Sequence, residues 1–153
     1  MRNDLKLAAF CVQRRSVAAA IFIGTHLGFS DVRQLASDRQ KARTAAVGFV
    51  NWILETFDID TVALESFEGS RDLMRAGTYQ EVEWTLRSRG VSVHTVPTPE
   101  FLKAFAHPTE VSRKDAREIV TGIWPILDPK RTHPATLDAV ALGLYCQTDR
   151  LLQ

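Results

Sequence analysis

Two short apolar runs near the start of the chain, residues 7–12 and 17–23, constrain the fold most strongly. Only the polar residues 13–16 separate them, which is the length of a tight connection between neighbouring antiparallel strands. Each run is continuously apolar rather than alternating, as in strands that are covered on both faces. We therefore predict a hairpin of two buried strands.

The remainder of the chain alternates between helical and extended patterns. Apolar residues recur at intervals of three and four over the expected helices, and short apolar segments bounded by turn residues mark the expected strands. The order predicts an α/β fold: a mixed central sheet, with an antiparallel meander of three strands followed by two parallel strands, flanked by helices on both faces. The expected elements after the hairpin are a strand around 32–35, a helix over 38–57, a strand over 61–65, a helix over 70–90, a strand over 91–96, a helix over 112–127 and a helix from Pro134.

Size and composition predict one domain over residues 1–153. Nineteen basic and eighteen acidic residues give a net charge of +1, so a surface for nucleic acid must come from local clustering. The apolar stretches are shorter than the roughly 18 residues of a membrane helix, and we expect no membrane partner. Two cysteines without metal-ligand spacing suit free thiols in a reducing cytosol, so we expect a cytoplasmic protein.

Two carboxylates are candidate catalytic residues because their sequence surroundings are apolar. Glu65 ends the predicted strand over 61–65, and catalytic groups gather at the strand ends of such sheets. Asp138 lies early in the predicted C-terminal helix, among small apolar residues. The simpler interpretations are an exposed glutamate at a strand end and an aspartate that is favoured by a helix N-terminus.

Five segments follow one another in an order and spacing that characterise a known family. They are the hairpin at 7–11 and 17–21, the strand at 62–65, the lysine-bearing segments at 99–103 and 112–115, whose lysines are eleven residues apart, and the helix segment at 137–142. Together they resemble the RuvC-type Holliday junction resolvases of the ribonuclease-H-like superfamily. The resemblance covers nearly the whole chain and implies a ribonuclease-H-like fold that acts on branched DNA.

The resemblance also implies a metal site to which Glu65 and Asp138 would contribute. In that family four carboxylates, or three with a histidine, hold two magnesium or manganese ions. Here the first-strand aspartate falls on Cys11, or on Val12 if the register shifts by one. The other late ligand, three residues before Asp138, falls on Ala135. Hard cations prefer oxygen ligands, so we expect magnesium binding at Glu65 and Asp138 to be weak or absent.

Cys11 has two conceivable roles of its own. A thiolate beside a histidine is a reactive nucleophile, but no spacing in the sequence brings a particular histidine to Cys11. We expect a buried structural thiol.

Four basic residues are candidate nucleic-acid ligands: Lys103, Arg113, Lys114 and Arg117. They lie in or beside the two lysine-bearing segments, and basic side chains next to a helix N-terminus offer phosphate both charge and backbone donors. The alternative interpretation is a solvated face that neighbouring acidic residues balance.

We expect a protein that binds branched or structured nucleic acid and is weakly active or inactive as a nuclease. The alternative is an active magnesium-dependent, structure-specific endodeoxyribonuclease in which Asp4 or Asp115 replaces the lost ligands. An ATPase of the actin and hexokinase type is less favoured, because no glycine-rich phosphate loop follows the strands of the hairpin.

The resemblance further implies a homodimer. The helix over residues 70–89 would pair with its copy, which would shield Leu73, Met74, Tyr79 and Trp84 from water.

Overall fold

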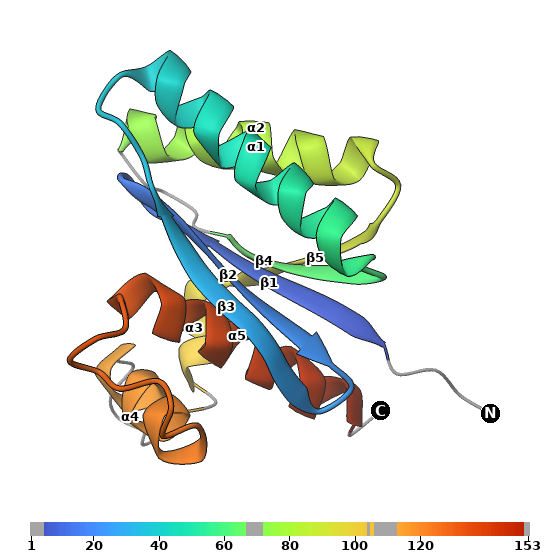
Figure 1. Cartoon of the computed structure of the whole chain (residues 1–153), viewed down its shortest axis with the longest axis vertical. Helices are drawn as coiled ribbons and strands as arrows, with labels where there is room; N and C mark the ends of the chain where they lie inside the picture. Colours follow the sequence, from blue (N-terminus) through green and yellow to red (C-terminus); the bar gives the residue numbers. More distant parts are fainter. Residues whose placement is uncertain (1–4, 67–71, 104, 106–112, 152–153) are drawn as a thin grey trace.

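The computed structural model describes residues 5–66, 72–103, 105 and 113–151. Its strands form one sheet in the order β3-β2-β1-β4-β5 (Figure 1). The strands β1 (Lys6–Val12), β2 (Ser16–Ile23) and β3 (His26–Gln34) are antiparallel neighbours, whereas β4 (Thr61–Ser66) runs parallel to β1, and β5 (Ser92–Pro97) runs parallel to β4. The predicted meander of three strands followed by two parallel strands is confirmed.

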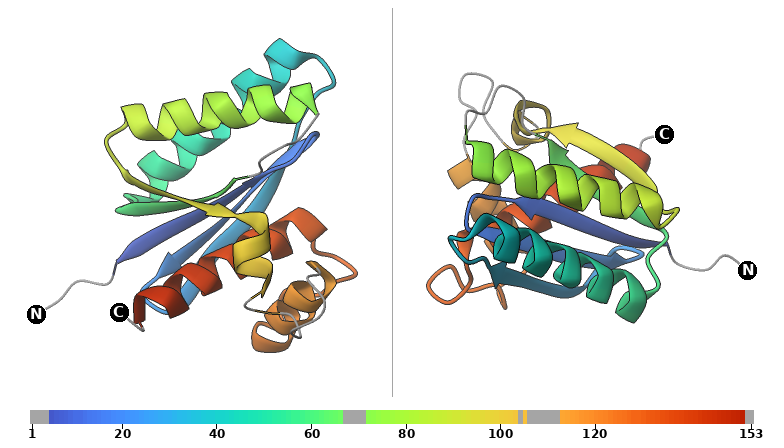
Figure 2. Two further views of the ribbon diagram at one scale, coloured as in Figure 1. Left: turned by 180° about the vertical axis from the view of Figure 1, so that it is seen from behind. Right: turned by 90° about the horizontal axis from the view of Figure 1, so that it is seen from above.

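Helices cover both faces of this sheet, as predicted (Figures 1 and 2). The helices α1 (Arg39–Phe57) and α2 (Leu73–Ser88) lie side by side on one face. On the other face α5 (Pro134–Leu151) packs on β1 and β2, and α4 (Arg113–Ile123) packs on α5. The short helix α3 (Thr98–Lys103) follows β5 directly. Within the described ranges, no helix has the length and apolar character that a membrane crossing requires.

Side chains of β1 alternate between two separate cores, which explains why its sequence is apolar at every position. The residues that pack towards α5 are Leu7, Ala9 and Cys11, and those that pack towards α1 and α2 are Ala8, Phe10 and Val12. Ala63 of β4 belongs to the α5 side, and Leu64 belongs to the opposite core. Because strand side chains alternate, Glu65 shares the face of Cys11 and not that of Val12.

Several elements differ in extent from the prediction, each for a local reason. The strand β3 is much longer than residues 32–35, because its half-exposed residues give no clear apolar pattern. The helix α4 ends at Ile123 rather than at 127, since Pro125 disfavours helical geometry in the residue before it. The helix α3 was not predicted. The expected start of α2 at Ser70 lies outside the described residues, and Asp72 caps that helix by accepting from the backbone N–H groups of Met74 and Arg75.

Close approach between α5 and the sheet depends on Gly143. A Cβ atom at this position would overlap the ring of Phe22 on β2. Gly143→Ala should therefore lower the free energy of unfolding by about 1–3 kcal/mol, the usual cost of overpacking a core. Gly48→Ala in α1 is the matched control: among the described residues, no atom outside the surrounding helix backbone and the two neighbouring residues lies within 4 Å of its added methyl group. Alanine favours a helix over glycine by about 0.5–1 kcal/mol, so urea unfolding should show opposite signs for the two variants; equal stabilities would contradict this packing.

Candidate functional site

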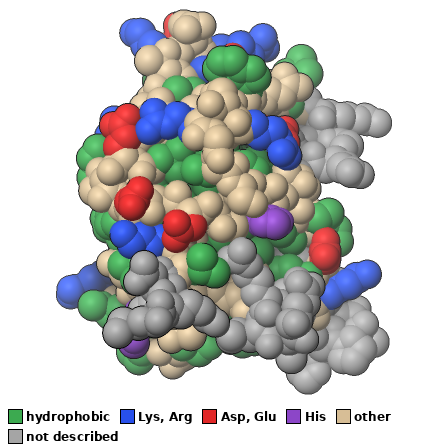
Figure 3. Space-filling view, turned by 90° about the vertical axis from the view of Figure 1, so that its right-hand side faces the viewer, with side chains coloured by type: hydrophobic (Ala, Val, Ile, Leu, Met, Phe, Trp, Pro, Cys, Tyr) green, Lys and Arg blue, Asp and Glu red, His purple; other side chains and the backbone are tan. Residues whose placement is uncertain are grey.

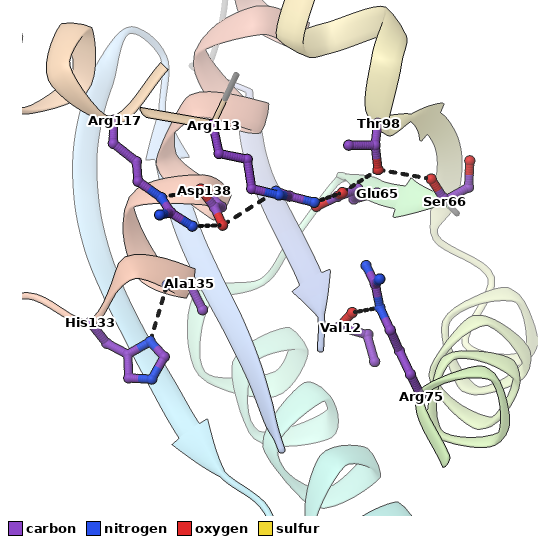
Figure 4. Close-up of polar contacts among 10 residues, drawn as sticks. All are labelled: Val12, Glu65, Ser66, Arg75, Thr98, Arg113, Arg117, His133, Ala135 and Asp138. Carbon is purple, nitrogen blue, oxygen red and sulfur yellow. Dashed lines mark hydrogen bonds and ion pairs between the residues drawn. The ribbon is translucent and has the colours of Figure 1, made fainter. Parts of the chain in front are cut away.

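The site lies at the edge of the sheet where β1 and β4 end. These strands are parallel neighbours with Phe10 opposite Leu64, so the residues that follow, Cys11 and Glu65, are adjacent. The first turns of α5 pack against the same edge and bring Asp138 to it. All three side chains are buried. The expected juxtaposition of Glu65 and Asp138 is therefore present in the fold (Figure 4), and Cys11 adjoins Glu65 on the neighbouring strand.

Two arginines of α4 neutralise the two carboxylates. Arg113 bridges them: its Nη2 lies 2.5 Å from Oε2 of Glu65, and its Nη1 lies 3.3 Å from Oδ2 of Asp138. Arg117 forms a bidentate pair with Asp138, with Nε 2.8 Å from Oδ1 and Nη2 2.9 Å from Oδ2. This fork-to-fork geometry is the strongest form of an arginine–carboxylate contact.

The ion pairs are layered, with the carboxylates inside and the guanidinium groups outside. The side chains of Glu65 and Asp138 are 0% and 3% exposed, whereas those of Arg113 and Arg117 are 26% and 33% exposed. A molecule that approaches this edge therefore meets nitrogen donors before it meets carboxylate oxygens.

The helix α3, which sequence patterns did not reveal, completes the surroundings of Glu65. The hydroxyl of Thr98, the first residue of α3, donates to Oε2 of Glu65 and is also 3.3 Å from the carbonyl oxygen of Ser66. The signal that could have marked this helix is Pro99, since proline is favoured in the first turn of a helix.

These contacts decide the protonation of Glu65. Burial alone would raise the pKa of this carboxyl, but the hydrogen bond and the charge of Arg113, with hydrogen bonds from Thr98 and Cys11, lower its pKa below the ordinary value. Burial likewise acts to lower the pKa of Arg113, and the bond and charge of Glu65, with the charge of Asp138, raise it overall. Both members of the pair are thus ionised at neutral pH.

Cys11 is a neutral thiol in this setting. Burial raises its pKa well above the ordinary value, and the charges of Glu65 and Asp138 raise it further. A thiol that keeps its proton is neither a good nucleophile nor a metal ligand. The structure confirms the buried thiol predicted from the sequence, and Cys11 donates a hydrogen bond to Glu65.

The residues at this edge do not fit the pair of magnesium ions that the resemblance implies. Cys11 and Ala135 offer no carboxylate, and both carboxylates that are present already face arginines. His133 does not replace a ligand, because its Nδ1 accepts from the backbone N–H of Ala135 at 3.0 Å (Figure 4). Among the described residues, no group of three or more histidine, cysteine, aspartate or glutamate side chains is arranged to hold a metal ion.

The remaining candidates lie on α3 and α4 or outside the described part of the chain. Lys103 is exposed at the end of α3, and Lys114 is exposed in the first turn of α4. Asp115 lies in the same turn but belongs to no metal-ligating group among the residues described, and Asp4 falls outside them. Arg75 of α2, which is not among the predicted site residues, also reaches this edge: its Nε donates to the carbonyl oxygen of Val12 at 2.8 Å.

Comparisons with known proteins agree with this architecture. No protein-family model matches the sequence, and no curated protein matches it significantly. Thermus thermophilus RuvC in complex with a Holliday junction substrate superposes with a TM-score of 0.79, at 16% identity over 96% of each chain. The yeast mitochondrial Holliday junction resolvase gives 0.68, at 8% identity over 98% of this chain and 83% of its own. The fowlpox virus resolvase, also with junction DNA, gives 0.59, at 16% identity over 97% of this chain and 100% of its own.

These likenesses establish that the chain has the ribonuclease-H-like fold of RuvC. For Thermus thermophilus RuvC the correspondence covers 96% of both chains.

The depressed pKa of Glu65 makes stability depend on pH with a defined sign. The contribution of ionised Glu65 is complete above the ordinary carboxyl pKa of 4.5 and is lost as the pH falls through the lower value of the folded state. Glu65→Gln should lower the free energy of unfolding at neutral pH by about 1–3 kcal/mol, because Arg113 loses a charged acceptor. The difference from the unmodified protein should shrink below pH 4.5, as followed by urea unfolding down to about pH 3.

Glu55→Gln is the control for this measurement. Glu55 pairs with Arg89 at 3.2 Å, but its side chain is 65% exposed. Exposed pairs contribute roughly 0–1 kcal/mol, so this variant should change stability little. A pH-independent effect of Glu65→Gln would contradict the assigned ionisation.

Proposed function

We propose that this protein binds branched DNA, four-way junctions above all, at the sheet edge around Glu65 and Asp138, and that it is weakly active or inactive as a nuclease. The observation that carries the proposal is the match over 96% of both chains to RuvC in complex with a Holliday junction substrate. The yeast and fowlpox matches, both to Holliday junction resolvases, support the same class of ligand.

The charge at the site argues against efficient hydrolysis. Two-metal hydrolysis of a phosphodiester needs carboxylates that are free to bind two divalent cations. Here Glu65 and Asp138 are saturated by Arg113 and Arg117, and Cys11 keeps its proton. The missing carboxylates at Cys11 and Ala135 and the two arginines beside the remaining carboxylates both disfavour a divalent cation. We therefore expect magnesium binding to be weak or absent.

The surface charge favours this edge over the opposite end of the sheet as the DNA-binding face. On the side of the molecule where β1 begins, basic and acidic side chains are interspersed among the described residues (Figure 3). At the C-terminal end of α2, Arg87 and Arg89 pair with Glu83 and Glu55. Lys103 is exposed on α3, whose first residue bonds to Glu65, and Lys114 is exposed on α4, which carries Arg113 and Arg117.

A binding and cleavage experiment tests this proposal. Gel-shift titration should show that a four-way junction binds more tightly than a linear duplex of the same sequence, with an affinity that falls as salt rises. Nicking of the junction in magnesium or manganese should be undetectable or very slow. Equal affinity for junction and duplex would contradict the binding proposal. Tighter binding of structured RNA than of the DNA junction would contradict the assignment of DNA as the ligand. Robust magnesium-dependent nicking that Glu65→Gln abolishes would favour the active endonuclease.

We further propose that the protein acts as a homodimer through α2. Leu73 and Trp84 are each 70% exposed, and they lie eleven residues apart, about three helical turns, so they share one side of the helix. Met74 and Tyr79 were also expected to be shielded by a partner, but they pack on the protomer's own core. The surface left for a partner is therefore the stripe that begins at Leu73 and ends at Trp84.

Disruption of this stripe should be visible in the molecular mass. Trp84→Asp should convert a dimer to a monomer in light scattering at micromolar concentration, because a charge would replace one of the two large apolar side chains that α2 offers to a partner. Ile126→Asp is the control, since Ile126 is 87% exposed but lies between α4 and α5. A monomeric unmodified protein, or a dimer that survives in Trp84→Asp, would contradict the assignment to α2.

A further inference from the structure

We propose that Arg113 and Arg117 receive one backbone phosphate of the bound DNA at the centre of the site, without a divalent cation. The inference rests on the proposed junction binding and specifies its chemistry. The residues present cannot hold a metal pair. The guanidinium groups would instead neutralise the phosphate at the edge where β1 and β4 end.

The layering of the ion pairs supports an anionic ligand. The buried carboxylates lie behind the guanidinium groups, so a phosphate at hydrogen-bond distance from Arg113 or Arg117 would be nearer to positive than to negative charge. Coulomb energy falls with distance, and the nearer charges therefore dominate. The same layering disfavours a cation, which would meet the guanidinium groups first.

The arginines also retain hydrogen-bonding capacity. Arg117 uses Nε and Nη2 for Asp138, and within the described residues its Nη1 has no hydrogen-bond partner. A guanidinium carries five N–H donors in a fixed plane. Because Asp138 already fixes the plane of Arg117, little side-chain freedom would be lost when Nη1 donates to a phosphate oxygen.

The charges of the two carboxylates and the two arginines cancel. Glu65 and Asp138 contribute two negative charges, and Arg113 and Arg117 contribute two positive charges, so the four side chains are together neutral. The carboxylates thus hold the arginines in place without creating an excess of negative charge that would repel DNA. A phosphate can bind while the ion pairs stay intact.

The test compares junction affinity with and without divalent cation, and with and without Arg117. Fluorescence anisotropy with a labelled four-way junction, at matched ionic strength, should give the same affinity within about twofold in EDTA and in magnesium. Arg117→Met should weaken binding about tenfold, the effect of one charge-assisted contact. The slope of log affinity against log salt should also decrease by about 1, as for the loss of one phosphate contact.

Arg89→Met is the matched control. Arg89 is also ion-paired, with Glu55, and its side chain is 37% exposed, close to the value for Arg117, but it lies at the far end of α2. It should leave affinity and salt slope unchanged. Thermal unfolding of each variant verifies the fold, and a lower stability without change in the salt slope would identify a purely structural role for Arg117.

If Arg117→Met does not fold, Arg117→Lys tests the same idea. Lysine keeps the charge but cannot form the bidentate pair, so the salt slope should persist while affinity falls. The inference is overturned if the unmodified protein binds junctions and Arg117→Met matches Arg89→Met, or if EDTA abolishes binding. Absence of junction binding by the unmodified protein is a separate outcome, which would overturn the proposed function itself.

Discussion

The whole site depends on how the protein accommodates two buried negative charges. An isolated ionised carboxylate in a protein interior is costly enough that it must be paired or lose its charge. Glu65 and Asp138 are both buried, and the guanidinium groups of α4 supply the pairing. Removal of one partner from such a buried pair typically costs about 3–5 kcal/mol, a large part of the stability of a domain. The ion pairs with Glu65 and Asp138 therefore help to hold α4 in its position at the sheet edge.

The pairing follows from topology rather than from any local sequence feature. Alternation along β1 and β4 puts Cys11 and Glu65 on the face that α5 covers, and α4 then packs on α5 through Ala116 and Val120. On a helix, residues four apart lie on one side. Arg113 and Arg117 are so spaced, and both reach the carboxylates. One helix thus supplies both counter-charges.

Most of the fold could be predicted from the sequence, as could two of the side chains that meet at the sheet edge. The continuous apolar pattern of β1 and β2 predicts the central hairpin, and the order of elements predicts the mixed sheet. Glu65 and Asp138 could be singled out because charged residues are rarely buried, so a carboxylate within an apolar segment indicates a specific role. Their pairing with Arg113 and Arg117 could not be predicted. Arg113 is 48 residues from Glu65 in the chain, and Arg117 is 21 residues from Asp138. The sequence does not distinguish an arginine that faces a carboxylate from one that faces a phosphate.

The pairing of both carboxylates with arginines has a consequence for building a metal centre at this edge. A variant with such a centre would need carboxylates at the positions of Cys11 and Ala135 and also the removal of Arg113 and Arg117. Each intermediate would carry an unbalanced buried charge and would lose a few kcal/mol of a stability that is itself only about 5–15 kcal/mol. Substitutions introduced one at a time would therefore each destabilise the fold, so the carboxylates and the arginines would have to be exchanged together.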